Sequence, residues 1–70
     1  MAGTRLRING KDVELTGPTP LVDYLVGLGV DPRAVAVEVD GEILPRDQVK
    51  SHVLQRGQVV EIVRMVGGGG

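Results

Sequence analysis

The chain has 70 residues, a mass of 7.4 kDa and a formal net charge of −1 at pH 7, which leaves room for one small domain. Its apolar share of 41% excludes a disordered body, and a single aromatic residue, Tyr24, with scattered cations disfavours nucleic-acid binding. Because cysteine is absent, His52 is the lone histidine and no long apolar segment occurs, we expect no disulfide, metal site or membrane span, and a cytoplasmic location.

A β-hairpin is predicted at the start of the chain. Residues 5–8 and 11–15 alternate polar and apolar side chains with period two, the pattern of half-buried strands. Between them stands Asn9-Gly10, a pair favoured in type I′ turns because both central residues need positive φ.

A short helix is predicted over residues 20–28. Thr19 stands where an N-cap is expected, and Pro20 fits the first helical position because its missing N–H is not needed there. Gly29 is expected to end the helix in the left-handed conformation. The apolar stripe consists of Leu21, Leu25 and Leu28.

Three strands are predicted in the second half of the chain. Valines alternate over residues 35–39, a turn follows at Asp40-Gly41, and residues 42–44 form a short strand that Pro45 ends. Residues 46–54 predict irregular structure with room for one helical turn. After a turn at residues 56–57, the nearly continuous apolar run of residues 58–66 is typical of a central strand covered on both sides.

The two faces of this last strand differ. Val60 and Ile62 are expected in the core, because the charged Glu61 between them needs solvent. Val63 and Met65 then fall on the open face of the sheet, directly before the glycines. An apolar patch beside a chain end predicts a docking surface, and methionine suits a surface that fits more than one partner.

The order strand–strand–helix–strand–strand–strand resembles the β-grasp architecture of ubiquitin. We therefore expect an α+β fold with a mixed sheet and one main helix packed on one face. Residues 1–66 are expected to form a single domain, followed by a flexible glycine tail over residues 67–70.

No catalytic constellation occurs in the sequence: it has no G-x-S-x-G elbow, no P-loop and no cysteine nucleophile. The acidic residues are expected to be solvated charges on strand faces or in turns; they are Asp12, Glu14, Glu38, Asp40, Glu42 and Glu61. Taken alone, the four glycines indicate a flexible end or an added tag. After the last strand of a β-grasp domain, we favour a chemical role for them.

Glycines can follow any backbone path, and four extended residues reach roughly 13–14 Å, enough to enter a narrow active-site channel. The terminal carboxylate has an ordinary pKa of about 3.3–3.7 and is ionised near neutral pH. Such a carboxylate can attack the α-phosphate of ATP, and a sulfur donor can convert the acyl-adenylate to a thiocarboxylate. The carrier then needs neither a catalytic side chain nor a cysteine.

Three segments together are typical of one family: Ile8-Asn9-Gly10, Ile43-Leu44-Pro45-Arg46, and the run over residues 57–62 that leads to the glycines. Over nearly its whole length the chain resembles the ThiS/MoaD group of ubiquitin-like sulfur carriers. Pro45-Arg46 is more similar to the ThiS-like carriers of thiamine biosynthesis than to their molybdopterin relatives, which usually place prolines before the terminal glycines. Two departures are the four glycines in place of the usual pair, and Val49 where thiamine carriers often have Trp.

The resemblance implies a protein co-substrate and not an enzyme. An E1-like adenylyltransferase would use ATP to activate the terminal Gly70, or Gly69 if Gly70 is an addition. A sulfur donor would then form the thiocarboxylate, and thiazole synthase would accept the sulfur. The expected partner-binding residues are Val63, Met65, Gly67, Gly68 and Gly69.

The resemblance also implies no bound cofactor, no nucleic-acid or membrane partner, and a monomer when the chain is free. Two alternatives stay open. The same chemistry can serve molybdopterin synthesis, tRNA thiolation, cysteine synthesis or protein conjugation, or the chain can be a β-grasp interaction module without carrier chemistry.

Overall fold

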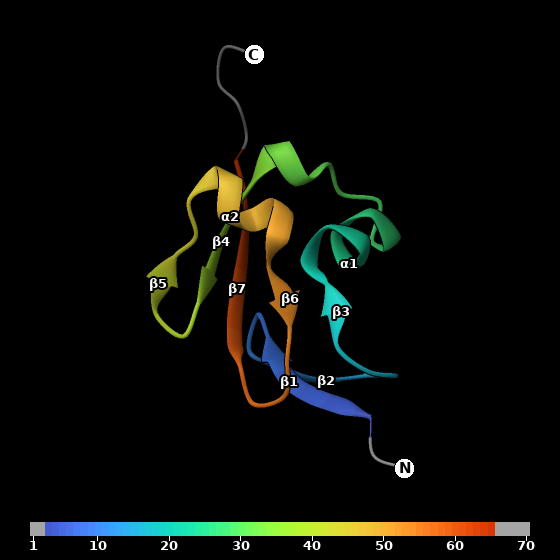
Figure 1. Cartoon of the computed structure of the whole chain (residues 1–70). Helices are drawn as coiled ribbons and strands as arrows, with labels where there is room; N and C mark the ends of the chain where they lie inside the picture. The colour runs from blue at the N-terminus through green and yellow to red at the C-terminus, as the bar shows by residue number, and fades with distance from the viewer. Residues whose placement is uncertain (1–2, 66–70) are drawn as a thin grey trace.

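The computed structural model describes residues 3–65 as a mixed five-stranded sheet with strand order β2-β1-β7-β4-β5, together with a two-stranded sheet of β3 and β6 (Figure 1). The strands are β1 (Thr4–Ile8), β2 (Lys11–Leu15), β3 (Thr19–Pro20), β4 (Val35–Val39), β5 (Glu42–Ile43), β6 (Val53–Leu54) and β7 (Val59–Arg64). The helices are α1 (Leu21–Gly27), the short 3-10 helix η1 (Pro32–Ala34) and α2 (Arg46–Ser51). The predicted α+β class with a mixed sheet is confirmed.

The hairpin of β1 and β2 forms as predicted. Asn9 and Gly10 have φ values of 52° and 79°, the two positive angles that a type I′ turn requires. On the outer face of the hairpin, Arg5 forms an ion pair with Glu14 at 3.3 Å. Arg7 likewise pairs with Asp12 at 3.6 Å, so the strand register brings opposite charges together.

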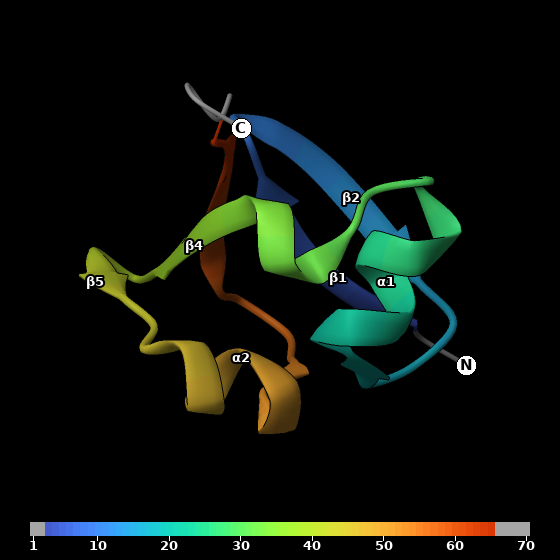
Figure 2. The ribbon, with the colours of Figure 1, turned by 90° about the horizontal axis from the view of Figure 1, so that it is seen from above.

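One face of the sheet buries an aliphatic core. In Figure 2 the sheet curves from β5 to β2 around the side on which α1 and α2 lie. The sheet, both helices and β6 contribute the core side chains, which are Leu6, Ile8, Leu21, Leu25, Val35, Val37, Val39, Val49, Leu54 and Val60. Tyr24 packs against this core only in part, so leucine, isoleucine and valine fill the interior.

Helix α1 begins one residue later than predicted. Pro20, not Thr19, is the N-cap, and Thr19 pairs with β6 as part of β3. The Leu21 N–H donates to the carbonyl oxygen of His52 at 2.9 Å, so a distant backbone acceptor replaces the expected threonine cap. The helix ends at Gly27, one residue earlier than predicted, and Gly29 has the predicted left-handed conformation with φ 78°.

Residues 46–54 are predicted to be irregular, with room for one helical turn. The structure instead forms a helix and a short strand in this segment. Pro45 is the N-cap of α2, and β6 follows the helix. Val49 is the one buried residue of α2, and Leu54 of β6 is fully buried. A single apolar anchor in a six-residue helix produces no periodicity that a sequence pattern can detect.

Strand β7 lies in the centre of the sheet, parallel to β1 and antiparallel to β4. Val60 is fully buried and Ile62 is half-buried, whereas the side chain of Val63 is 59% exposed. The predicted orientation of the two faces of this strand is therefore confirmed, whereas the expectation that both sides are covered is wrong, because Val59, Glu61 and Val63 are exposed.

Two turn side chains extend the hydrogen bonding of β7. Asn9 Oδ1 accepts from the Ile62 N–H at 2.7 Å, beyond the point where β1 turns away. On the other edge, Asp40 Oδ1 accepts from the Val59 N–H at 2.9 Å. Asp40 is exposed as expected, but it also has this structural role, which the sequence pattern does not predict.

Replacing Leu25 by Ala should lower the free energy of unfolding by about 2–5 kcal/mol, because it leaves a cavity in a core without large rings to fill it. Urea denaturation followed by circular dichroism measures this loss. As a control, Val26→Ala on the exposed side of α1 should cost less than about 0.5 kcal/mol. A loss below about 1 kcal/mol for Leu25→Ala would contradict the packing of α1.

Replacing Asn9 by Gly should lower the free energy of unfolding by about 0.5–1.5 kcal/mol, because glycine keeps the positive φ but removes the acceptor for the Ile62 N–H. Asn9→Asp keeps an acceptor and should restore most of the loss. Amide hydrogen exchange gives the local readout, with faster exchange of the Ile62 N–H in Asn9→Gly only. Equal exchange in both variants would show that this hydrogen bond does not hold β7.

Candidate functional site

The candidate site lies where β7 ends. The pairing of β1 with β7 stops at Ile8 and Val60, whereas β4 follows β7 as far as Arg64. The Met65 N–H still donates to the Ala34 carbonyl oxygen at 2.8 Å. Figure 1 shows β7 running to the end of the domain at which α2 and η1 lie. Backbone hydrogen bonds therefore hold the chain up to Met65, which we call the tail root.

The glycines predicted to carry the chemistry, Gly67, Gly68, Gly69 and Gly70, lie outside the described residues. The structure describes instead the tail root and the surfaces around it.

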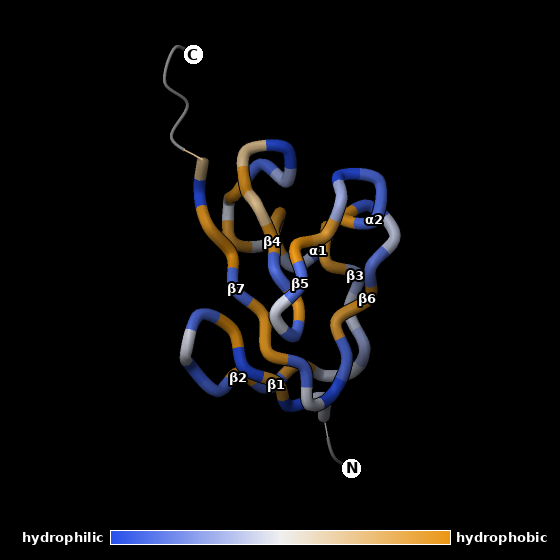
Figure 3. The backbone as a smooth tube through the Cα atoms, turned by 90° about the vertical axis from the view of Figure 1, so that its left-hand side faces the viewer, coloured by the Kyte–Doolittle hydropathy of each residue, from blue (hydrophilic) through white to orange (hydrophobic). Residues whose placement is uncertain are grey.

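The first of these surfaces is the open face of the sheet, on the side away from the core. Its apolar side chains are Ile43, Val59, Val63 and Met65, which are all exposed. Val63 lies opposite Ala36 in the register of β4 and β7. Figure 3 shows that hydrophobic residues make up most of β7. The structure thus places both predicted docking residues of this strand, Val63 and Met65, at the surface next to the tail root.

Two carboxylates interrupt this apolar face. Glu38 and Glu61 lie directly opposite each other in β4 and β7. Like charges in this arrangement destabilise a sheet. The ion pairs found among residues 3–65 involve other carboxylates, so neither glutamate is neutralised within the described part of the chain.

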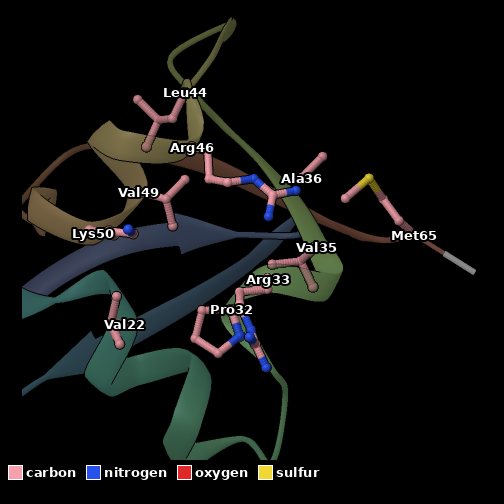
Figure 4. A pocket seen from close by; sticks show the side chains of 10 residues that line it. All are labelled: Val22, Pro32, Arg33, Val35, Ala36, Leu44, Arg46, Val49, Lys50 and Met65. Carbon is pink, nitrogen blue, oxygen red and sulfur yellow. The ribbon is translucent and has the colours of Figure 1, made fainter. Parts of the chain in front are cut away.

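The second surface is a groove of about 350 Å³ beside the tail root (Figure 4). It is lined from α1, η1, β4, α2 and the residue after β7, by Val22, Pro32, Arg33, Val35, Ala36, Leu44, Arg46, Val49, Lys50 and Met65. The sequence pattern does not predict this groove, because its lining comes from segments far apart in the chain. Three residues singled out from the sequence nevertheless line it, namely Arg46 of the Pro45-Arg46 pair, Val49 and Met65.

The cations of the groove differ in their surroundings. Asp31 Oδ1 accepts from the Arg33 N–H at 2.9 Å and from the Arg33 guanidinium at 3.4 Å. These hydrogen bonds hold the pKa of the Asp31 carboxyl below its usual value, so Asp31 is ionised beside Arg33 at neutral pH. Arg46 and Lys50 take part in none of the ion pairs among residues 3–65. Within this part of the chain, no carboxylate forms an ion pair with these two lining residues.

Residues 3–65 contain no group of three or more histidine, cysteine or acidic side chains placed to hold a metal ion. His52 is half-buried, and its Nε2 lies 3.4 Å from Gln58 Oε1. No helix within the same residues is long and apolar enough to cross a membrane.

Comparison with curated proteins finds two enzymes that contain a similar region. The thiazole synthase of Magnetococcus marinus is 34% identical over 65 residues, and that of Paramagnetospirillum magneticum is 37% identical over 65 residues. Each match covers 93% of this chain but 20% of the enzyme. The chain therefore spans about a fifth of the length of these relatives.

Comparison with solved structures finds the same fold in two structures from Geobacter metallireducens. The crystal structure of thiamine biosynthesis protein ThiS has a TM-score of 0.76 at 30% identity and covers 94% of this chain and 100% of that chain. The solution structure of a thiamine biosynthesis protein has a TM-score of 0.71 at 28% identity, with coverage of 96% and 90%.

The model of the ThiS family matches residues 6–69, which is most of the chain. Together with the full-length match to a solved ThiS structure, it shows that this chain belongs to the ThiS family, the sulfur carriers of thiamine biosynthesis.

Proposed function

We propose that the terminal glycine of this chain carries sulfur as a thiocarboxylate, which supplies the sulfur for thiazole formation in thiamine biosynthesis. The observation that carries the proposal is the position of the glycine run in a family of sulfur carriers. In the sequence it follows the tail root, Met65, whose N–H donates to the carbonyl oxygen of Ala34 in η1 at the end of the central strand. A glycine run on a rigid root can enter an active site while the domain docks outside it.

The chemistry uses the terminal carboxylate, Gly70 or Gly69, as the nucleophile. A carboxylate oxygen attacks the α-phosphorus of ATP, and the bond to pyrophosphate breaks, which leaves an acyl-adenylate. A sulfide-level donor then attacks the acyl carbon, AMP leaves and the thiocarboxylate remains. The chain supplies no catalytic side chain and is a co-substrate in this scheme.

The proposed partners follow from these steps. An E1-like adenylyltransferase binds ATP and takes in the tail, so the chain itself binds no cofactor. A sulfur donor acts next, and thiazole synthase accepts the sulfur. The thiazole synthases that contain a region similar to this chain support that last partner. We place the reaction in the cytoplasm, where ATP is available, and expect the free carrier to be a monomer.

The chain should gain about 16 Da when it is incubated with the adenylyltransferase of the same genome, ATP and sulfide, because one terminal oxygen is replaced by sulfur. Intact-mass spectrometry measures the gain, and fragmentation locates it. Omission of ATP is the control and should abolish the gain. Sulfur at any position other than the terminal glycine would contradict the proposal. If Gly70 is an addition, a chain that ends at Gly69 should react faster than the full chain.

We further propose that Val63 and Met65, with Gly67, Gly68 and Gly69, bind the proteins that act on the tail. Val63 is 59% and Met65 is 48% exposed, beside the tail root. Single exposed apolar residues are common, but these two share the open face with exposed Ile43 and Val59.

Replacing Val63 and Met65 together by Asp should weaken binding to the adenylyltransferase about tenfold or more, because two apolar contacts become charges that binding must desolvate. Isothermal titration calorimetry measures the Kd. The matched control replaces Val26 and Leu28, two exposed apolar residues of α1 and its C-cap, by Asp. Both double variants should keep a thermal midpoint close to that of the parent chain. Equal weakening by the control pair, or none by the test pair, would refute this docking surface.

A further inference from the structure

We propose that the groove beside the tail root binds an acidic segment of the adenylyltransferase. An apolar side chain of that segment enters the groove, and flanking carboxylates meet Arg46 and Lys50. The inference rests on the proposed function for the identity of this partner, and on the groove for the chemistry of the contact.

Charge is the first argument. The chain has eight lysine and arginine residues and a net charge of −1, yet three of these cations line this one groove, without any acidic lining residue. Arg5 and Arg7 are paired on the hairpin and Arg33 is paired with Asp31. Five cations take part in no ion pair among residues 3–65, and Arg46 and Lys50 are the two of them that line this groove. Two such cations side by side favour a carboxylate-bearing occupant.

The interior of the groove favours an apolar side chain of the occupant, placed between the carboxylates that meet Arg46 and Lys50. Val35 and Val49 are almost fully buried, and Val22 and Leu44 are half-buried. Figure 4 shows the guanidinium of Arg46 between Val49 and Val35, whereas that of Arg33 points away from them. A volume of about 350 Å³ lies within the range of small binding pockets and leaves room for a leucine-sized or phenylalanine-sized side chain.

The position of the groove identifies the partner. Ala36 and Met65 line it, and Ala36 lies opposite Val63 in the sheet. The groove is therefore continuous with the proposed docking face, and both adjoin the tail root. A protein that holds this face and takes in the tail lies against the groove, so one of its segments is the natural occupant.

The aliphatic stems of Arg46 and Lys50 can cover apolar surface without any partner. The test must therefore separate the effect of the two charges on binding from the effect of the stems. Arg46→Gln with Lys50→Gln removes the charge, and Arg46→Glu with Lys50→Glu reverses it on stems of the same length as those of the glutamine pair. The matched control reverses two exposed cations outside the groove, with Lys11→Glu and Arg56→Glu. The assay is pyrophosphate release by the adenylyltransferase at increasing concentrations of carrier.

We expect the half-saturating carrier concentration to rise about threefold for the glutamine pair and about tenfold or more for the glutamate pair, with the maximal rate within about twofold of the parent. This pattern corresponds to lost binding with intact chemistry. The control pair should stay within about twofold of the parent in both quantities. Circular dichroism and the thermal midpoint check that each variant is folded. An unchanged half-saturating concentration in the glutamate pair, or an equal rise in the control pair, would overturn the proposal.

The occupant is identified by cross-linking. A carrier with p-benzoylphenylalanine in place of Val22 should cross-link to a peptide of the adenylyltransferase that carries aspartate or glutamate beside an apolar residue. A cross-link to a second carrier molecule, to the carrier's own tail or to a peptide without carboxylates would overturn the proposal. The mass gain of the parent chain distinguishes a failure of the groove proposal from a failure of the proposed function. If the parent gains mass but the groove variants behave like it, the groove proposal fails alone, whereas a parent without mass gain contradicts the proposed function itself.

Discussion

Hydrogen bonding on both edges of β7 is the interaction on which the rest of the structure depends. β1 pairs with this strand in parallel and β4 in antiparallel, so the hairpins from the first and the middle parts of the chain join only through the last strand. Isolated two-stranded hairpins are marginally stable at best in water. The segment that leads to the glycines therefore also completes the sheet, and the hydrogen bond of the tail root to Ala34 depends on the same strand pairing.

The two surfaces beside the tail root have different physical origins. The open face exposes Val63 because one side of an antiparallel pair can remain uncovered by helices. The groove exists because α2 is short and contributes only Val49 to the core, which leaves the space between α1, η1 and β4 partly unfilled. Both surfaces border Met65. An apolar face and a cationic groove therefore meet at the end of the central strand.

Sequence patterns predict those helices and strands that neighbouring residues alone determine. The period-two alternation and the Asn9-Gly10 turn predict the hairpin, and the leucine spacing predicts α1 to within a residue or two. The errors arise where distant residues decide. The carbonyl of His52 replaces the expected cap of α1, and Asn9 holds a strand 53 positions away in sequence. The same limit applies to the site. The strand pattern predicts the exposure of Val63, but the groove needs residues from several elements and has no local signature.

The parallel register of β1 and β7 also determines where the chain can be tethered. Thr4 begins β1 three positions before Arg7, which lies opposite Val59, and Met65 lies six positions beyond that point. At about 3.3 Å per residue, the start of β1 and the tail root are roughly 30 Å apart, at opposite ends of the sheet. A surface, a tag or a second domain joined directly before β1 is therefore held at the end of the sheet away from the tail root. A short linker from that side cannot guide the tail into an active site on the attached domain, so such a linker must be long enough to span the sheet.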